Sequence, residues 1–182
     1  MIIGIVGSTG SGKGEISNEL EKRGFVKLIF SDFLREECKK KGIAITRDVL
    51  RDLGNELREK NGAGYIAKRL LEKVDRNKNY VLEGIRNPDE IKALREFGDS
   101  IIVGLEAPIE KRLQWIIMRN RENDPHSIQD VKKLDDENNG KGQPEYGLQI
   151  DKCMKMIDIK LVNDKSKEDL KKKVDKLLRG IK

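Results

Sequence analysis

The chain has 182 residues, carries a formal net charge of +6 at pH 7, and is 38% charged but only 4% aromatic. This length predicts one domain with a sizeable core, and no apolar run approaches the roughly 20 residues that span a bilayer. The positive charge suits an anionic ligand, but acidic residues are interspersed among the basic ones, so we expect a small molecule rather than nucleic acid. Cys38 and Cys153 form no C-x-x-C pair, which predicts free thiols and a cytoplasmic protein.

The first element is a short Ile- and Val-rich run, Met1–Val6, typical of a strand buried on both faces. A glycine-rich loop follows, and then a helical pattern with Ile16 and Leu20 on one face. Strand, loop and helix in this order predict a phosphate-binding loop, because glycines let N–H groups face an anion and the helix start adds partial positive charge. We expect it to bind ATP through Gly7, Ser8, Thr9, Gly10, Ser11, Gly12, Lys13 and Gly14.

The next segments alternate between strand and helix. A second strand is predicted over Val26–Phe30, followed by a helix that continues to about Lys41 and ends at Gly42. Thr46 is placed to cap a helix from Arg47 to about Lys60. A further helix is expected at 64–74.

A third strand, Tyr80–Leu82, ends at Glu83 and Arg86, after which Asn87 and Pro88 predict a helix start. The fourth strand is expected at 101–105, and Pro108 opens a long helix with an apolar side.

Residues 120–147 are polar and glycine-rich, and Ser127 to Asp130 has the pattern of a capping box. A polar helix on glycine-rich arms predicts a mobile lid. Beyond it we expect a helix at 146–156, a fifth strand at 157–162, and a last helix capped by Ser166.

Five strands separated by helices predict an α/β fold, a three-layer P-loop NTPase with a five-stranded parallel sheet flanked by helices. Ligands in such sheets bind beyond the carboxyl ends of the strands. The glycine loop, Asp32 with Arg35, and Glu83 with Arg86 each follow a strand in this way.

These motifs resemble the P-loop nucleoside monophosphate kinase family, with a layout closest to the archaeal adenylate-kinase-related proteins. The Gly-Lys-Gly cradle, Ser31–Arg35, Glu83–Arg86 and the helix from Pro108 to Arg121 carry the resemblance, in that order along the chain. The resemblance implies one kinase domain over residues 1–182, with an acceptor-binding insert at about 31–75 and a lid at about 120–147.

The resemblance also implies the roles of the site residues. Lys13 would hold the phosphates of ATP, Arg35 and Arg86 the acceptor phosphate, and Arg119 and Arg121 would approach the transferring group with the lid. The remaining assignments are Mg²⁺ held through water by Glu83 and Asp32, and the adenine contacts Trp115 and Asn163.

Three features differ from adenylate kinase: Glu15 replaces a threonine, Lys152 and Lys155 stand where an arginine pair is usual, and position 115 is Trp. The first prediction is therefore ATP-dependent phosphorylation of a nucleoside or deoxynucleoside monophosphate. One alternative is transfer to a sugar hydroxyl, as in dephospho-CoA kinase, with Asp32 as general base. Another is a nucleotide-gated ATPase that binds RNA or ribosomal partners. A weaker likeness to phage deoxynucleotide kinases lies in 51–58.

Overall fold

The computed structural model describes residues 1–120 and 124–181. These residues form five strands and nine helices, with one to three helices between successive strands. The elements are β1 (Ile2–Gly7), α1 (Lys13–Glu21), β2 (Val26–Ile29), α2 (Phe30–Lys41), α3 (Arg47–Asn61), α4 (Tyr65–Leu71), β3 (Tyr80–Glu83), α5 (Pro88–Phe97), β4 (Ser100–Glu106), α6 (Ile109–Arg119), α7 (Ile128–Asn138), α8 (Ile150–Met154), β5 (Ile159–Val162) and α9 (Lys167–Gly180).

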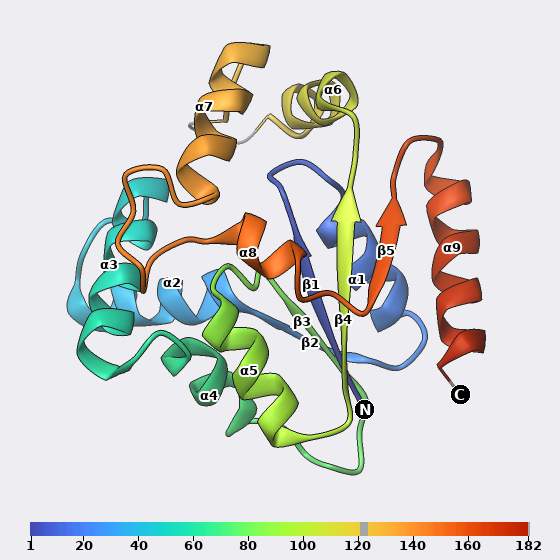
Figure 1. Ribbon diagram of the computed structural model, residues 1–182, viewed down its shortest axis with the longest axis horizontal. Coiled ribbons are helices and arrows are strands. Elements are labelled where there is room, and N and C mark those ends of the chain that lie inside the picture. Colours follow the sequence, from blue (N-terminus) through green and yellow to red (C-terminus); the bar gives the residue numbers. More distant parts are fainter. Residues whose placement is uncertain (121–123, 182) are drawn as a thin grey trace.

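The five strands form one parallel sheet in the order β2-β3-β1-β4-β5 (Figure 1). Strand β1 lies at the centre, where Ile2 is in register with Tyr80 of β3 and with Ser100 of β4. All six residues of β1 are buried, as its continuous apolar run predicts. The α/β fold with a five-stranded parallel sheet is thus confirmed.

Two separate apolar cores explain the three layers. On one face, Ile3 and Ile5 of β1 pack with buried side chains of α1 and α9, such as Ile16 and Val174. On the other face, the core joins β1 and β3 to helices α2, α3, α4, α5 and α8. Alternate residues of the same strand therefore serve opposite layers.

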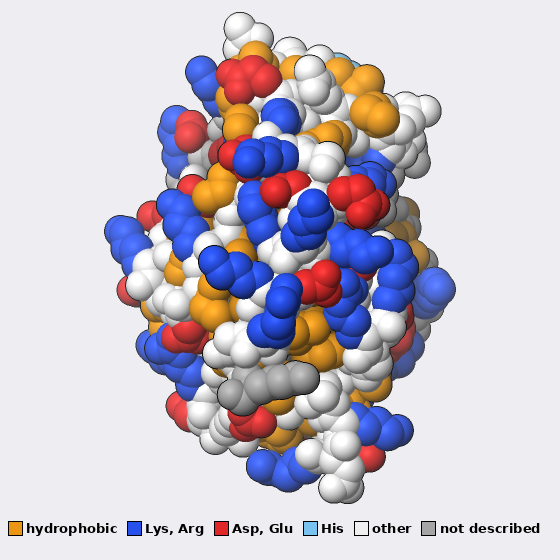
Figure 2. Space-filling model, turned by 90° about the vertical axis from the view of Figure 1, so that its right-hand side faces the viewer, with side chains coloured by type: hydrophobic (Ala, Val, Ile, Leu, Met, Phe, Trp, Pro, Cys, Tyr) orange, Lys and Arg blue, Asp and Glu red, His pale blue; other side chains and the backbone are white. Residues whose placement is uncertain are grey.

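The carboxyl ends of the strands face helices α6 and α7, and the glycine loop after β1 lies at this edge (Figure 1). Helix α9 runs beside β5 on the outer side of the molecule. Figure 2 shows this side, where Lys and Arg side chains are spread among acidic ones. No helix in the described ranges is long and apolar enough to cross a membrane.

Most of the predicted helix starts are confirmed by their caps. The side chains of Thr46, Asn87, Ser127 and Ser166 each accept a hydrogen bond from a backbone N–H group of the helix that follows. Asn87 and Ser127 complete capping boxes with a carboxylate three residues later. Polar residues that satisfy the free N–H groups thus fixed these boundaries.

The helix expected at 146–156 is wrong in its first half, because α8 begins only at Ile150. The backbone groups that a helix would use are bonded elsewhere: the Asn87 amide donates to the carbonyls of Glu145 and Gly147, and Gln149 N–H donates to the Arg86 carbonyl. The segment Gln143–Gln149 is therefore a non-helical strap, in which the Gly147 N–H donates to the Pro144 carbonyl at 2.8 Å.

Smaller corrections concern element ends. Phe30 opens helix α2 instead of ending β2, α4 stops at Leu71, and β5 begins at Ile159. Residues 157 and 158, which were expected in β5, precede the strand instead. The Asp158 carboxylate accepts a hydrogen bond from the Ile102 N–H, 2.7 Å away.

Candidate nucleotide-binding site

The glycine loop makes tight turns that a side chain would prevent. Gly12, which precedes α1, has φ of 99°, and a Cβ there would lie 2.4 Å from the Asn163 amide nitrogen. Gly10 has φ of 78°, and its Cβ would lie 2.8 Å from Ile116. The N–H groups of Glu15 and Ile16 donate to the Gly12 carbonyl, which leaves those of Lys13 and Gly14, at the start of α1, to face an anion.

Lys13 is folded back over this loop. Its Nζ donates to the carbonyl oxygens of Gly7 and Ser8, at 2.7 and 2.8 Å. Burial lowers the pKa of Lys13 from 10.5 to about 7, and the nearby charge of Arg86 acts in the same direction, against Glu83. An incoming polyphosphate would restore the charge of this lysine.

A cavity of about 460 Å³ opens beside the loop, which we call the donor cavity. This volume is within the range of small-ligand sites. The half-buried Trp115 and the exposed Met118, both on α6, line it together with Asn163. The Asn163 amide donates to the Ser11 carbonyl at 3.0 Å, so this side chain supports the loop. The adenine contacts assigned to Trp115 and Asn163 stay predictions.

A second cavity, of about 410 Å³, which we call the acceptor cavity, adjoins the first. Gly10, Lys13, Glu83 and Arg119 line both cavities. The cations on the wall of the second cavity come from five different segments of the chain. They are Lys13, Arg35, Arg47, Arg51, Arg58, Arg86 and Arg119.

Arg86 differs from the other cations on the wall of this cavity in its surroundings. It is half-buried, and its guanidinium makes no hydrogen bond or ion pair with the residues that the structure describes. Burial lowers the pKa of Arg86 from 12.5 to about 10, and the charges of Arg58 and Arg47 add to this effect. The predicted convergence of Arg86 with Lys13 is therefore present in the structure.

Two other predicted arginines, Arg35 and Arg119, have carboxylate partners. Arg35 donates to Asp32, 2.7 Å away, and to Ser31, 2.8 Å away. Arg119 forms a bidentate pair with the buried Asp124, both contacts at 2.7 Å. Asp32 lines neither cavity, whereas Glu83 lines both, and the water-mediated Mg²⁺ contact assigned to Asp32 stays a prediction.

Arg121 lies outside the described residues. Its predicted approach to the transferring group stays a prediction.

Sequence reasoning missed Arg58 and Arg112, which are both buried. Arg58 on α3 pairs with the buried Glu90 on α5. Arg112 donates to Asp135 of α7, at 2.6 and 3.0 Å, and to the Thr9 carbonyl of the glycine loop. Helical spacing was the available signal for Arg112, because it stands three and four residues from the apolar Ile109 and Ile116.

Arg47 and Arg51 were also missed, although both lie on the wall of the acceptor cavity. Their positions on a strongly charged helix are equally typical of a solvated face, so spacing alone could not distinguish the two cases.

The residues present fit a nucleotide with Mg²⁺. The buried Ser11 hydroxyl has no partner within the described part of the chain, and a Cβ at Gly14 would lie 3.8 Å from the Glu83 carboxylate, so this acid lies close to the start of α1. The described residues contain no cluster of three His, Cys, Asp or Glu side chains. Mg²⁺ would thus be held by phosphate oxygens and water, with Glu83 beside it.

Comparison with known proteins agrees with this geometry. A family profile described as an AAA domain matches residues 6–132. A UPF0200 protein of Sulfurisphaera tokodaii is 31% identical over 180 residues, covering 99% of this chain and 97% of its own. The chain belongs to the UPF0200 family. A further UPF0200 protein, from Thermococcus onnurineus, is 32% identical over 188 residues and covers 100% of this chain and 98% of its own.

Solved structures confirm the fold of this UPF0200 protein as that of P-loop kinases. The shikimate kinase of Aquifex aeolicus has a TM-score of 0.57 at 18% identity, with 99% of this chain and 97% of that chain covered. The shikimate kinase of Acinetobacter baumannii has a TM-score of 0.54 at 19% identity, with 100% and 94% covered. The predicted kinship with P-loop kinases is confirmed.

Proposed function

We propose that this UPF0200 protein is an ATP-dependent phosphotransferase that phosphorylates a nucleoside or deoxynucleoside monophosphate. The observation that carries the proposal is the junction of the two cavities at Lys13, Glu83 and Arg119. Phosphoryl transfer requires a donor and an acceptor to meet end to end while charge is neutralised at the point of contact. The shared wall supplies cations at that point.

Each residue then has a role that its position supports. Lys13 and the N–H groups of the loop hold the donor phosphates, and Arg119 stabilises negative charge on the transferring group, which is worth about 10³–10⁵ in rate in enzymes of this kind. Arg35 and Arg86 bind the acceptor phosphate, because a planar guanidinium contacts two oxygens at once. Glu83 orients the water around Mg²⁺.

The test is an ADP-release assay across ribo- and deoxyribonucleoside monophosphates and dephospho-CoA, with ATP and Mg²⁺. We expect turnover with at least one monophosphate. Lys13→Ala should lose several orders of magnitude, whereas Lys22→Ala, which changes an exposed lysine of the same region, should remain active. Near wild-type turnover of Lys13→Ala would contradict the proposal.

Transfer to a hydroxyl is the second candidate, since the Asp32 carboxylate forms an ion pair with Arg35, which lines the acceptor cavity. A hydroxyl acceptor benefits from a base, whereas a phosphate acceptor needs arginines. Arg35→Ala should therefore be the more damaging change, and Asp32→Asn the milder one. The reverse order would favour the hydroxyl acceptor.

The RNA-binding alternative depends on the basic residues of α9, which are mixed with acidic ones (Figure 2). It predicts tight RNA binding that weakens steeply with salt, together with no turnover on any monophosphate.

A further inference from the structure

Glu15 is an acid inside a site for anions. It is the third residue of α1, whose first N–H groups face the phosphate-binding loop, and its side chain lines the donor cavity. A carboxylate in the first turn interacts favourably with the helix dipole and stabilises the helix. Toward a polyphosphate in the same cavity, however, it is a like charge that opposes binding.

Lys167 offsets this charge from a distant part of the chain. Its Nζ lies 3.0 Å from the Glu15 carboxylate, although the two residues are 152 positions apart. Lys167 is the first residue of α9 and also lines the donor cavity. The pair therefore brings an ammonium group to the cavity that holds Lys13.

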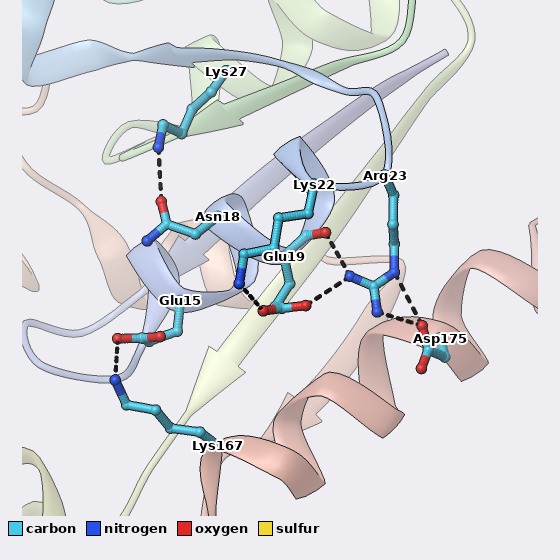
Figure 3. A network of polar contacts seen from close by, with 8 residues as sticks. All are labelled: Glu15, Asn18, Glu19, Lys22, Arg23, Lys27, Lys167 and Asp175. Atoms are coloured by element: carbon cyan, nitrogen blue, oxygen red, sulfur yellow. Dashed lines mark hydrogen bonds and ion pairs between the residues drawn. The ribbon is translucent and has the colours of Figure 1, made fainter.

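The pair is not needed to hold α9 against α1. Figure 3 shows a separate connection between these helices, in which Arg23 contacts both Glu19 and Asp175. The side chain of Lys167 is 81% exposed and that of Glu15 47% exposed, and exposed ion pairs contribute little to stability. The position of the pair on the cavity wall is thus its distinguishing property.

We propose that Lys167 is a donor-binding residue that contacts the phosphates of ATP and offsets the negative charge of Glu15 at the cavity. An ammonium group has three donors, so it can bind a phosphate oxygen and keep its contact with Glu15. Without Lys167, the uncompensated charge of Glu15 faces the nucleotide. This inference rests on the proposed function, in that it takes ATP as the donor.

The test compares two single variants whose effects have opposite signs. Lys167→Ala should weaken ATP binding about tenfold, which corresponds to about 1.4 kcal/mol. Glu15→Gln should leave the affinity unchanged or increase it, because a repulsive charge is removed. The double variant should regain only the part of the loss that the uncompensated charge of Glu15 causes. Titration calorimetry with ATP measures all three, and the fluorescence of Trp115, the one tryptophan of the chain, gives a second readout.

The matched control is Lys171→Ala, one turn further along α9 and outside the donor cavity, which should bind ATP as the wild type does. In turnover, Lys167→Ala should raise KM for ATP and leave KM for the acceptor unchanged. Equal losses in Lys167→Ala and Glu15→Gln would indicate a merely structural pair and overturn the inference, as would unchanged affinity in Lys167→Ala. A wild-type protein that binds no ATP would instead refute the proposed function.

Discussion

The buried pair between Arg58 of α3 and Glu90 of α5 offers the strongest test of how the acceptor side is built. Arg58 Nε and Nη2 donate to one oxygen of Glu90, at 3.0 and 2.8 Å. The other oxygen accepts the N–H groups of Arg86 and Asn87, at 2.8 and 3.1 Å. The side chains of the pair are 3% and 0% exposed. Glu90 therefore connects α3 to the turn that carries Arg86.

Arg58→Met keeps most of the side-chain volume but leaves the charge of Glu90 buried without its partner. Breaking a buried ion pair in this way costs about 3–5 kcal/mol. For a protein of this size, each kcal/mol lowers Tm by about 2–4 °C, so a drop of roughly 6–20 °C is expected. Urea unfolding should show the corresponding loss in the free energy of unfolding.

The control lies on the same helix. Lys60 and Glu56 form an ion pair at 2.7 Å with both side chains exposed, and Lys60→Ala should leave Tm nearly unchanged. The double variant Arg58→Met with Glu90→Leu should cost less than the two single changes added together, since no charge remains buried. A loss below about 1 kcal/mol in Arg58→Met would refute this reasoning.

Three further predictions concern the glycine loop and the ion pair between Arg112 and helix α7. Binding of ATP above pH 7.5, where phosphate is ionised, should take up a proton, because the pKa of Lys13 in the free protein is about 7 and the bound state favours the charged amine; affinity then falls as pH rises, and calorimetry in buffers of different ionisation enthalpy measures the uptake. Gly12→Ala should abolish ATP binding through its contact with Asn163, whereas Gly24→Ala, with no atom within 4 Å of the new Cβ, should bind normally. Arg112→Met should lower Tm by breaking the ion pair with α7, and scanning calorimetry would contradict this if Tm were unchanged.

Local signals in the sequence predicted the framework of the molecule well. The glycine loop and the caps at Thr46 and Asn87 depend on residues a few positions apart, so their chemistry can be recognised without the fold. The succession of strands and helices along the chain followed from the alternation of apolar runs with helical patterns.

The buried arginines could not be predicted in the same way, because their partners are distant in the sequence. Arg58 lies on a helix whose surface is rich in charge, and its burial depends on Glu90, which is 32 residues away. Gly54, one turn earlier, leaves room for the guanidinium: a Cβ there would lie 3.1 Å from it. A small residue one turn from an arginine is a weak signal until the facing helix is known.

The helix predicted from residue 146 does not form before Ile150 for a related reason. The composition of the strap at Gln143–Gln149 permits a helix, but its carbonyl groups are bonded by the Asn87 amide, and Gln143 accepts a hydrogen bond from Asn55 of α3 at 3.0 Å. Hydrogen bonds to residues distant in the sequence thus replaced the local hydrogen bonds that a helix would have formed.

The charges at the junction of the two cavities explain why this site favours anions. Burial and neighbouring cations lower the pKa values of Lys13 and Arg86, so the protein holds these groups in an electrostatically unfavourable arrangement before a ligand binds. Three other arginines on the same wall, at 35, 58 and 119, have carboxylate partners that hold them in place. A phosphate entering between Lys13 and Arg86 would relieve the repulsion between them, and the paired arginines would keep their positions. The arrangement thus favours the binding of a phosphate group at the point where transfer between two phosphate groups would occur.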